Sequence, residues 1–181
     1  MVDRKEIMMR ILNLHGLGED SDNNNYRTIR TIFPDASIIS ETIDYVNTNP
    51  NDIIKKYSHV GKIDVVVGDS LGGFLAYVIG IKLKVNTLLT NPLIPASDHI
   101  SDLVENYAYT SELKSLWSKY MFQNEKCYIL IGEETDIIDP IKIGQQMMYT
   151  AEVSVVLYKG NILDGPVYED WMKTHLSGLA R

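Results

Sequence analysis

Short apolar runs alternate with longer amphipathic segments along most of this 181-residue chain. The apolar runs are typical of buried strands, and they predict six, at residues 8–15, 37–40, 63–67, 85–90, 127–131 and 153–158. Helical patterns are predicted up to residue 33, over 50–58, from 74 onward, and over 96–124, 140–149 and 167–179. Asn23, Asn24 and Asn25 are expected to supply capping side chains for the first of these helices. Because strands and helices alternate, we expect right-handed crossovers and a mostly parallel sheet with helices on both faces.

One strand-to-helix turn carries candidate chemistry. Residues 68–72, Gly-Asp-Ser-Leu-Gly, fit the pattern G-x-S-x-G between a β-branched apolar run and an apolar helix. A serine on so tight a turn, here Ser70, lifts its hydroxyl clear of the sheet, and the flanking glycines remove Cβ atoms that would clash. The next amide, on Leu71, lies at a helix N-terminus and can donate to a developing oxyanion. The same pattern is also compatible with a tight crossover that has no chemistry.

The loop after the first predicted strand, residues 15–18, lies at the same edge of the sheet and reads His-Gly-Leu-Gly. Hydrolases that use a serine on such a turn place a second oxyanion donor in this loop, so Leu17 N–H is the candidate. We expect His15 to brace the loop, because it precedes the serine and lies at the turn itself.

An acyl-transfer serine also needs a base, and usually a carboxylate that orients the base. The carboxylate is expected after the fifth strand, where four acidic residues lie between positions 133 and 139. Asp139 directly precedes Pro140 at a helix start, which favours a capping role for its side chain. We therefore predict Asp136 as the acid.

The base is the least determined member of the site, because the loop after the sixth predicted strand contains no histidine. The one later histidine, His175, lies inside the last helix on an apolar stripe with Met172 and Leu179. We take His175 as the provisional base, and a structural residue on the core face is the alternative. His99, in the helical stretch after the fourth strand, is a further candidate, with capping and solvation as its alternative role.

Length and composition set further expectations. The chain is long enough for one full core, so we expect a single domain over 1–181 with a helical cap inserted over roughly 92–124. A net charge of −7 without a basic cluster argues against nucleic acid and anionic membranes as partners. The partners left are a small acyl substrate, another protein or a second copy of the chain. No cofactor or metal ion is expected.

The single cysteine, Cys127, begins an apolar run and is expected to be a buried strand thiol, so no internal disulfide can form. The N-terminal residues are charged and lack the apolar stretch of a signal peptide. No apolar run approaches the roughly 18 residues of a membrane span. We therefore expect a cytoplasmic protein.

With these segments placed, the chain resembles the small α/β-hydrolases of the YqiA-type esterase family over most of its length. The resemblance rests on Leu-His-Gly-Leu at 14–17, the serine turn at 68–76, Asn-Pro-Leu-Ile-Pro at 91–95, and the loop 132–139. It implies an α/β-hydrolase-like three-layer fold with a small helical cap. It also implies hydrolysis of carboxyl esters or thioesters by a Ser-Asp-His triad.

Two positions depart from the family's pattern. An ungapped match of the acidic loop puts the family's aspartate at Thr135, so Asp136 serves only if the loop shifts by one residue. The family's histidine corresponds to the region near Gly160, which holds none. Two functions therefore follow. The first is a serine hydrolase that acts on a small acyl ester or thioester through Ser70, Asp136 and His175. The second is a binding or regulatory protein on a hydrolase scaffold with an incomplete triad.

Overall fold

The computed structural model describes residues 8–132, 139–147, 151–155 and 165–179. The strands are β1 (Arg10–Leu14), β2 (Ser37–Ser40), β3 (Val65–Asp69), β4 (Asn86–Thr90), β5 (Cys127–Ile131) and β6 (Ala151–Val155). The helices are α1 (Asn24–Ile32), α2 (Pro50–Tyr57), α3 (Ser70–Leu83), α4 (Ala96–Leu103), α5 (Thr110–Tyr120), α6 (Pro140–Met147) and α7 (Pro166–Leu179).

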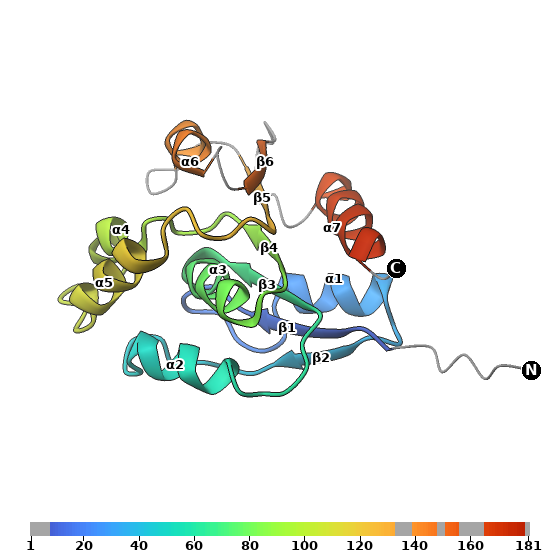
Figure 1. Ribbon diagram of the computed structural model, residues 1–181, viewed down its shortest axis with the longest axis horizontal. Helices are drawn as coiled ribbons and strands as arrows, with labels where there is room; N and C mark the ends of the chain where they lie inside the picture. Colours follow the sequence, from blue (N-terminus) through green and yellow to red (C-terminus); the bar gives the residue numbers. More distant parts are fainter. Residues whose placement is uncertain (1–7, 133–138, 148–150, 156–164, 180–181) are drawn as a thin grey trace, which may run out of the picture.

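The six described strands form one parallel sheet in the order β2-β1-β3-β4-β5-β6 (Figure 1). The chain first moves outward from β1 to β2 and then returns to place β3 on the other side of β1. The carboxyl ends of β1 and β3 therefore flank the point where the strand order reverses, which is where ligands bind in sheets of this type. The predicted parallel sheet is confirmed.

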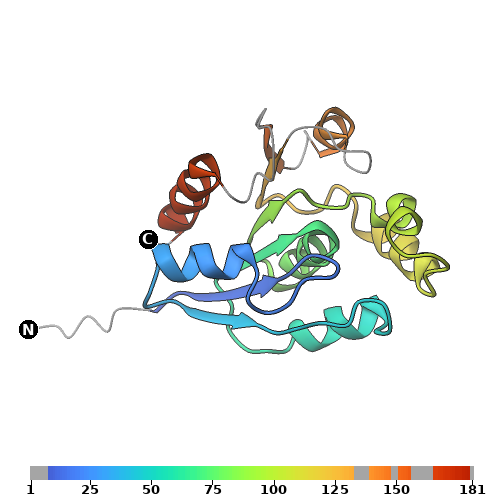
Figure 2. The ribbon, with the colours of Figure 1, turned by 180° about the vertical axis from the view of Figure 1, so that it is seen from behind.

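Helices cover both faces of the sheet and create two apolar cores (Figures 1 and 2). Helices α2 to α6 contribute to the core that contains Val66 and Phe74. Helices α1 and α7, which lie side by side in Figure 2, cover the opposite core, where Val65 and Val67 are buried. Because successive side chains of a strand point to opposite faces, the three valines of β3, Val65 to Val67, are buried alternately in the two cores.

Helix α3 begins at Ser70, earlier than the start near residue 74 predicted from the apolar run. Gly72 and Gly73 obscured the first turn, because glycine is a poor helix former. Every residue from Leu71 to Gly80 is buried. The helix is therefore apolar on all sides and occupies the middle of its core.

The predicted helical stretch 96–124 contains two helices, α4 and α5. Between them, Asn106 has a φ of +54°, in a left-handed region that asparagine tolerates better than most residues. Ile100 of α4 and Leu113 of α5 are both buried in the core around α3. These two helices, which lie between β4 and β5 in the sequence, therefore pack in the same core as α3.

Cys127 is buried at the start of β5, as predicted, and burial raises the pKa of its thiol. A thiol held in its neutral form is a poor nucleophile, so Cys127 is a packing residue. In the described part of the chain, no helix is long and apolar enough to cross a membrane.

Candidate active site

The turn between β3 and α3 is tight, because the strand ends at Asp69 and the helix begins at the next residue. Ser70 is the first residue of α3 and has a φ of +49°, in a region that serine rarely adopts. The Leu93 N–H donates to the Ser70 carbonyl at 3.0 Å, which ties the turn to the segment after β4. Strained backbone of this kind persists where the surrounding structure fixes it, and it clusters at functional sites.

Two glycines allow α3 to approach the strands this closely. A Cβ on Gly72 would lie 2.1 Å from the His15 carbonyl oxygen, and one on Gly68 would lie 2.6 Å from the Cβ of Ala76. Both distances are far shorter than van der Waals contact, so a larger residue does not fit at either position. The Leu71 amide is thereby set in the first turn of α3, where N–H groups have no acceptor within the helix.

The side chain of His15, which is 1% exposed, holds the loop after β1. Its Nε2 accepts from Ile43 N–H at 2.8 Å, and its Nδ1 donates to the Gly16 carbonyl at 2.7 Å. Both ring nitrogens are engaged, which confirms that His15 braces the loop. The Gly16 N–H donates to Glu19 Oε2 at 2.9 Å, so this amide is already engaged. The next amide along the loop is that of Leu17.

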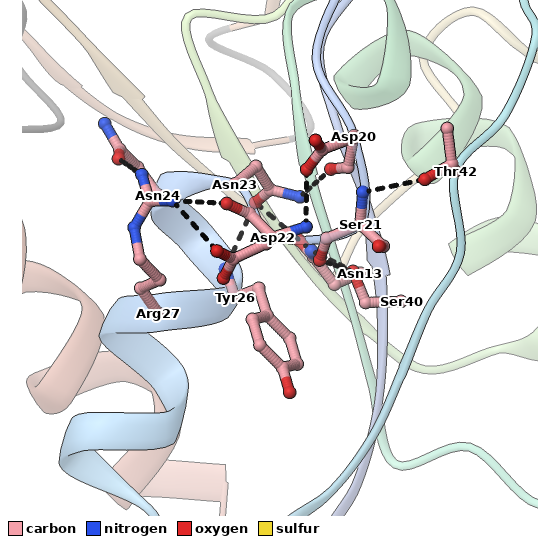
Figure 3. Close-up of polar contacts among 10 residues, drawn as sticks. All are labelled: Asn13, Asp20, Ser21, Asp22, Asn23, Asn24, Tyr26, Arg27, Ser40 and Thr42. Atoms are coloured by element: carbon pink, nitrogen blue, oxygen red, sulfur yellow. Dashed lines mark hydrogen bonds and ion pairs between the residues drawn. The ribbon is translucent and has the colours of Figure 1, made fainter.

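A network of polar side chains anchors the far end of this loop at the N-terminus of α1 (Figure 3). The Asn23 side-chain oxygen accepts from Tyr26 N–H at 3.1 Å and from Asn13 Nδ2 at 3.2 Å. Asn13 Nδ2 also donates to Ser40 Oγ at 3.0 Å. One side chain therefore caps α1 and connects it to β1, and through Asn13 to β2. The capping predicted from the asparagines at 23–25 is confirmed at Asn23.

Asp69, next to Ser70, is a buried carboxyl for which the sequence predicted no role. Its Oδ1 accepts from Thr90 Oγ1 at 2.8 Å. A Cβ on Gly16 would lie 2.9 Å from Asp69 Oδ2 and 3.2 Å from Glu19 Oε2. Burial raises the pKa of Asp69 to about 7; the Thr90 hydrogen bond opposes this shift and the Glu19 carboxylate adds to it. Two carboxyl groups therefore face the loop that carries the second candidate oxyanion donor.

His175 makes its contacts within and beside α7. Its Nδ1 donates to the Trp171 carbonyl at 2.8 Å, and its Nε2 lies 3.7 Å from Glu152 Oε1. The ring packs against Tyr128, with ring centroids 4.8 Å apart. These contacts fit the alternative of a structural histidine.

The sheet register separates His175 from Ser70. Tyr128 is level with Val67 across β4, so it lies about 10 Å before Ser70 along the strand direction and two strands away. Helix α7 also covers the face of the sheet opposite to α3. The structure thus does not bring the predicted base to the predicted nucleophile.

The acidic loop is described only at its end. Asp136, the predicted acid, lies outside the described residues. Asp139 caps α6, because its Oδ1 accepts from Lys142 N–H at 3.0 Å and its carbonyl accepts from Ile143 N–H at 3.0 Å. The capping role predicted for Asp139 is confirmed. No three His, Cys, Asp or Glu side chains in the described ranges are grouped to hold a metal ion.

His99 differs from the other histidines in its surroundings. It lies half-buried in α4, beside a cavity of about 10 Å³ that Asp139 and Leu93 also line. No described residue forms a hydrogen bond or an ion pair with its ring, whereas the rings of the other three histidines are hydrogen-bonded. Leu93 is the residue whose N–H donates to Ser70. His99 and Asp139 lie far apart in the sequence, so the sequence pattern did not predict that they line the same cavity. His99 was a candidate there because of its residue type alone.

The parallel sheet with helices on both faces and a strained serine between β3 and α3 define the class: this is an α/β-hydrolase fold. Within that class, the chain belongs to the uncharacterised protein family UPF0227, whose model matches residues 10–156. The fold class and the resemblance expected from the sequence are both confirmed.

Solved structures with very different sequences share this fold. A monoacylglycerol lipase from Paleococcus ferrophilus has a TM-score of 0.68 at 12% identity, over 94% of this chain and 93% of its own. Est1E from Butyrivibrio proteoclasticus has a TM-score of 0.69 at 8% identity, over 98% of this chain and 90% of its own. Alpha/beta hydrolase domain-containing protein 10 from mouse has a TM-score of 0.66 at 12% identity, over 94% of this chain and 88% of its own. No curated protein sequence matches the chain. Likenesses at such low identity establish the fold.

Proposed function

We propose that this protein is a serine hydrolase that cleaves a small acyl ester or thioester, with Ser70 as the nucleophile. The observation that carries the proposal is the φ of +49° at Ser70, on the turn between β3 and α3 at the ligand-binding edge of the sheet. A serine held in this way presents its hydroxyl outside the sheet. The lipase of like fold supports an ester as the substrate class.

The amides of Leu17 and Leu71 are the proposed donors to the oxyanion. Leu71 is the second residue of α3, so its N–H has no acceptor within the helix. Leu17 lies in the loop that His15 braces, and Gly72 brings this loop and α3 together at the end of β1. Donors that are fixed before the reaction stabilise the developing charge without reorganisation.

His99 is the proposed base. Its ring borders the cavity that Asp139 and Leu93 share, and Leu93 is hydrogen-bonded to the Ser70 backbone. Asp139 is the carboxylate proposed to orient the imidazole, and Asp136 stays the predicted alternative for that role. A base of this kind needs a free ring nitrogen within reach of the serine hydroxyl once substrate is bound.

The reaction proceeds in two halves. Ser70 Oγ forms a bond to the acyl carbon while its proton passes to His99, and the alcohol or thiol then leaves with that proton. A water molecule gives a proton to His99 and attacks the acyl-enzyme. The carboxylic acid departs, and the proton on His99 returns to Ser70.

Labelling with a fluorophosphonate probe tests this proposal on the wild type and the variants Ser70→Ala, His99→Gln and His175→Gln. We expect Ser70→Ala to abolish labelling and His99→Gln to slow it by about 10³-fold or more, because the serine loses its base. His175→Gln should label at nearly the wild-type rate. Circular dichroism of each variant shows whether the fold is retained. Hydrolysis of p-nitrophenyl acetate and of a short acyl thioester then identifies the preferred leaving group.

Two results would contradict the assignments. Slow labelling of a folded His175→Gln variant, with His99→Gln unaffected, would return the base to the last helix. A folded wild type that does not label would overturn the hydrolase proposal and favour the binding or regulatory protein that the sequence also predicts.

A further inference from the structure

A second cavity, of about 280 Å³, lies between α2, α3 and α5. Each helix contributes a lysine from its last turn, namely Lys55, Lys82 and Lys119. Ser70 begins α3 and Lys82 lies twelve residues later, so the cavity is about 18 Å from the serine along the helix axis. Figures 1 and 2 show the three helices together, away from α1 and α7. The cavity is therefore separate from the candidate active site.

The rim of the cavity is positively charged, although the whole chain has a net charge of −7. None of the described residues that line it is Asp or Glu, and none of the three lysines forms an ion pair with a described residue. Lysines in last turns also offset helix C-termini, which carry about −0.5 charge each. Three lysines against three termini leave an excess of about +1.5, so the cavity attracts an anion even after the helix dipoles are counted.

The floor of the cavity is apolar. Ile54 and Leu116 are only 2% and 6% exposed. The ring of Tyr120 lies 6.0 Å from Lys82 Nζ and 5.2 Å from Lys119 Nζ, measured to the ring centroid. The Tyr120 ring thus lies close to two of the lysine charges on the rim, while the side chains of Ile54 and Leu116 form the floor of the cavity. This combination suits a ligand with one charged end and one apolar end.

Ser58 adds a polar atom at the end of α2. Its Oγ is buried and has no hydrogen-bond partner among the described residues, and Ser58 lines the cavity. A buried hydroxyl without a partner is unfavourable. Rotation of the Ser58 side chain toward the cavity would let a ligand oxygen accept from the hydroxyl, which would remove that penalty.

We propose that this cavity binds a small organic phosphate monoester, with the phosphate against the lysines and Ser58 and the organic part on Ile54 and Leu116. Lysine binds phosphate as a point charge, and the excess of about +1.5 on the rim matches the nearly two negative charges of a phosphate monoester better than the single charge of a carboxylate. The volume has room for about nine water-sized groups, which fits a phosphate with one ring or a short chain.

Isothermal titration calorimetry with phenyl phosphate tests the proposal. The titrated protein carries Ser70→Ala, so acyl transfer is excluded and a failure of the hydrolase proposal leaves the result unaffected. We expect saturable binding that is weakened about tenfold or more by Lys82→Gln and by Lys119→Gln, because each removes a charge-assisted contact. Lys114→Gln is the matched control, since Lys114 is an exposed residue of α5 outside the cavity. Ser58→Ala should also weaken binding.

Benzoate and inorganic phosphate separate the two ends of the ligand. Both should bind more weakly than phenyl phosphate, because benzoate lacks the second charge and inorganic phosphate lacks the apolar part. The proposal is overturned if phenyl phosphate does not bind to the folded protein, if binding survives both lysine substitutions, or if benzoate binds as tightly. Thermal unfolding of each variant confirms that lost binding does not reflect a lost fold.

Discussion

At the residue scale, the carboxyl of Asp69, which precedes the candidate nucleophile Ser70, makes the stability of the protein depend on pH. Burial raises its pKa from the ordinary value of 3.8 to about 7, the Thr90 hydrogen bond opposes the shift, and the Glu19 carboxylate adds to it. Between about pH 4 and pH 7 the folded protein holds a proton that the unfolded chain has lost. The free energy of unfolding therefore falls as the pH rises through this window.

The variant Asp69→Asn keeps an acceptor for the Thr90 hydroxyl and removes the ionisation. We expect it to be as stable as the wild type near pH 4 and more stable at pH 8, by on the order of 2–4 kcal/mol. Urea unfolding across this pH range measures the difference.

The control is Asp44→Asn, at an exposed position where hydrogen bonds from Asn47 lower the pKa of the carboxyl. The ionised Asp44 carboxylate stabilises the folded protein, and this stabilisation is lost as the pH falls. The pH dependence that Asp44→Asn removes is therefore opposite in sign to the one that Asp69→Asn removes. A constant difference between Asp69→Asn and wild type at every pH would contradict the raised pKa of Asp69.

At the scale of elements, the site depends on the close approach of α3 to the end of β1. A Cβ on Gly72 would lie 2.1 Å from the carbonyl oxygen of His15 and 2.7 Å from that of Leu14. Both are backbone atoms of a central strand and its loop, which cannot move aside as the end of a flexible side chain can. The glycine is thus required by contact between two elements.

The substitution Gly72→Ala gains about 1 kcal/mol of helix propensity but forces a backbone overlap. We expect a net loss of about 3 kcal/mol or more in the free energy of unfolding, measured by urea unfolding. Gly178→Ala makes the same change in α7, where no atom of the other described segments lies within 4 Å of the added Cβ. It should stabilise the protein by roughly 0.5–1 kcal/mol. Equal stability of Gly72→Ala and wild type would show that α3 and β1 are further apart.

At the scale of the whole molecule, one sheet separates two cores, and a central strand serves both. Ile11 and Leu12 are neighbours in β1 and are both fully buried, on opposite faces. We expect Ile11→Ala and Leu12→Ala each to lower the free energy of unfolding by about 2–5 kcal/mol. Met8→Ala, at a residue that is 57% exposed, should change it by less than about 0.5 kcal/mol. Thermal or urea unfolding makes the comparison, and a tolerated change at only one of the two buried positions would mean that one face is not a packed core.

The sequence by itself determined the features that arise within a few residues. The order of strands and helices follows from apolar periodicity, and the fifth strand was predicted with its observed bounds, Cys127–Ile131. The serine turn and the capping roles of Asn23 and Asp139 were also predicted, because glycine spacing and short polar side chains act on the backbone beside them. The start of α3 was missed, since its two glycines resemble a loop.

Only the tertiary structure decided which distant side chains meet. His175 was expected at the serine but lies beside Tyr128 on the opposite face, whereas His99 lies with Asp139 next to the segment bonded to Ser70. The carboxyl pair at Asp69 and the lysine-rimmed cavity likewise join residues from different elements. The physical reason is that such contacts depend on strand register and on the rotation of each helix about its axis. Both are set by packing across the whole core, and no local pattern encodes them.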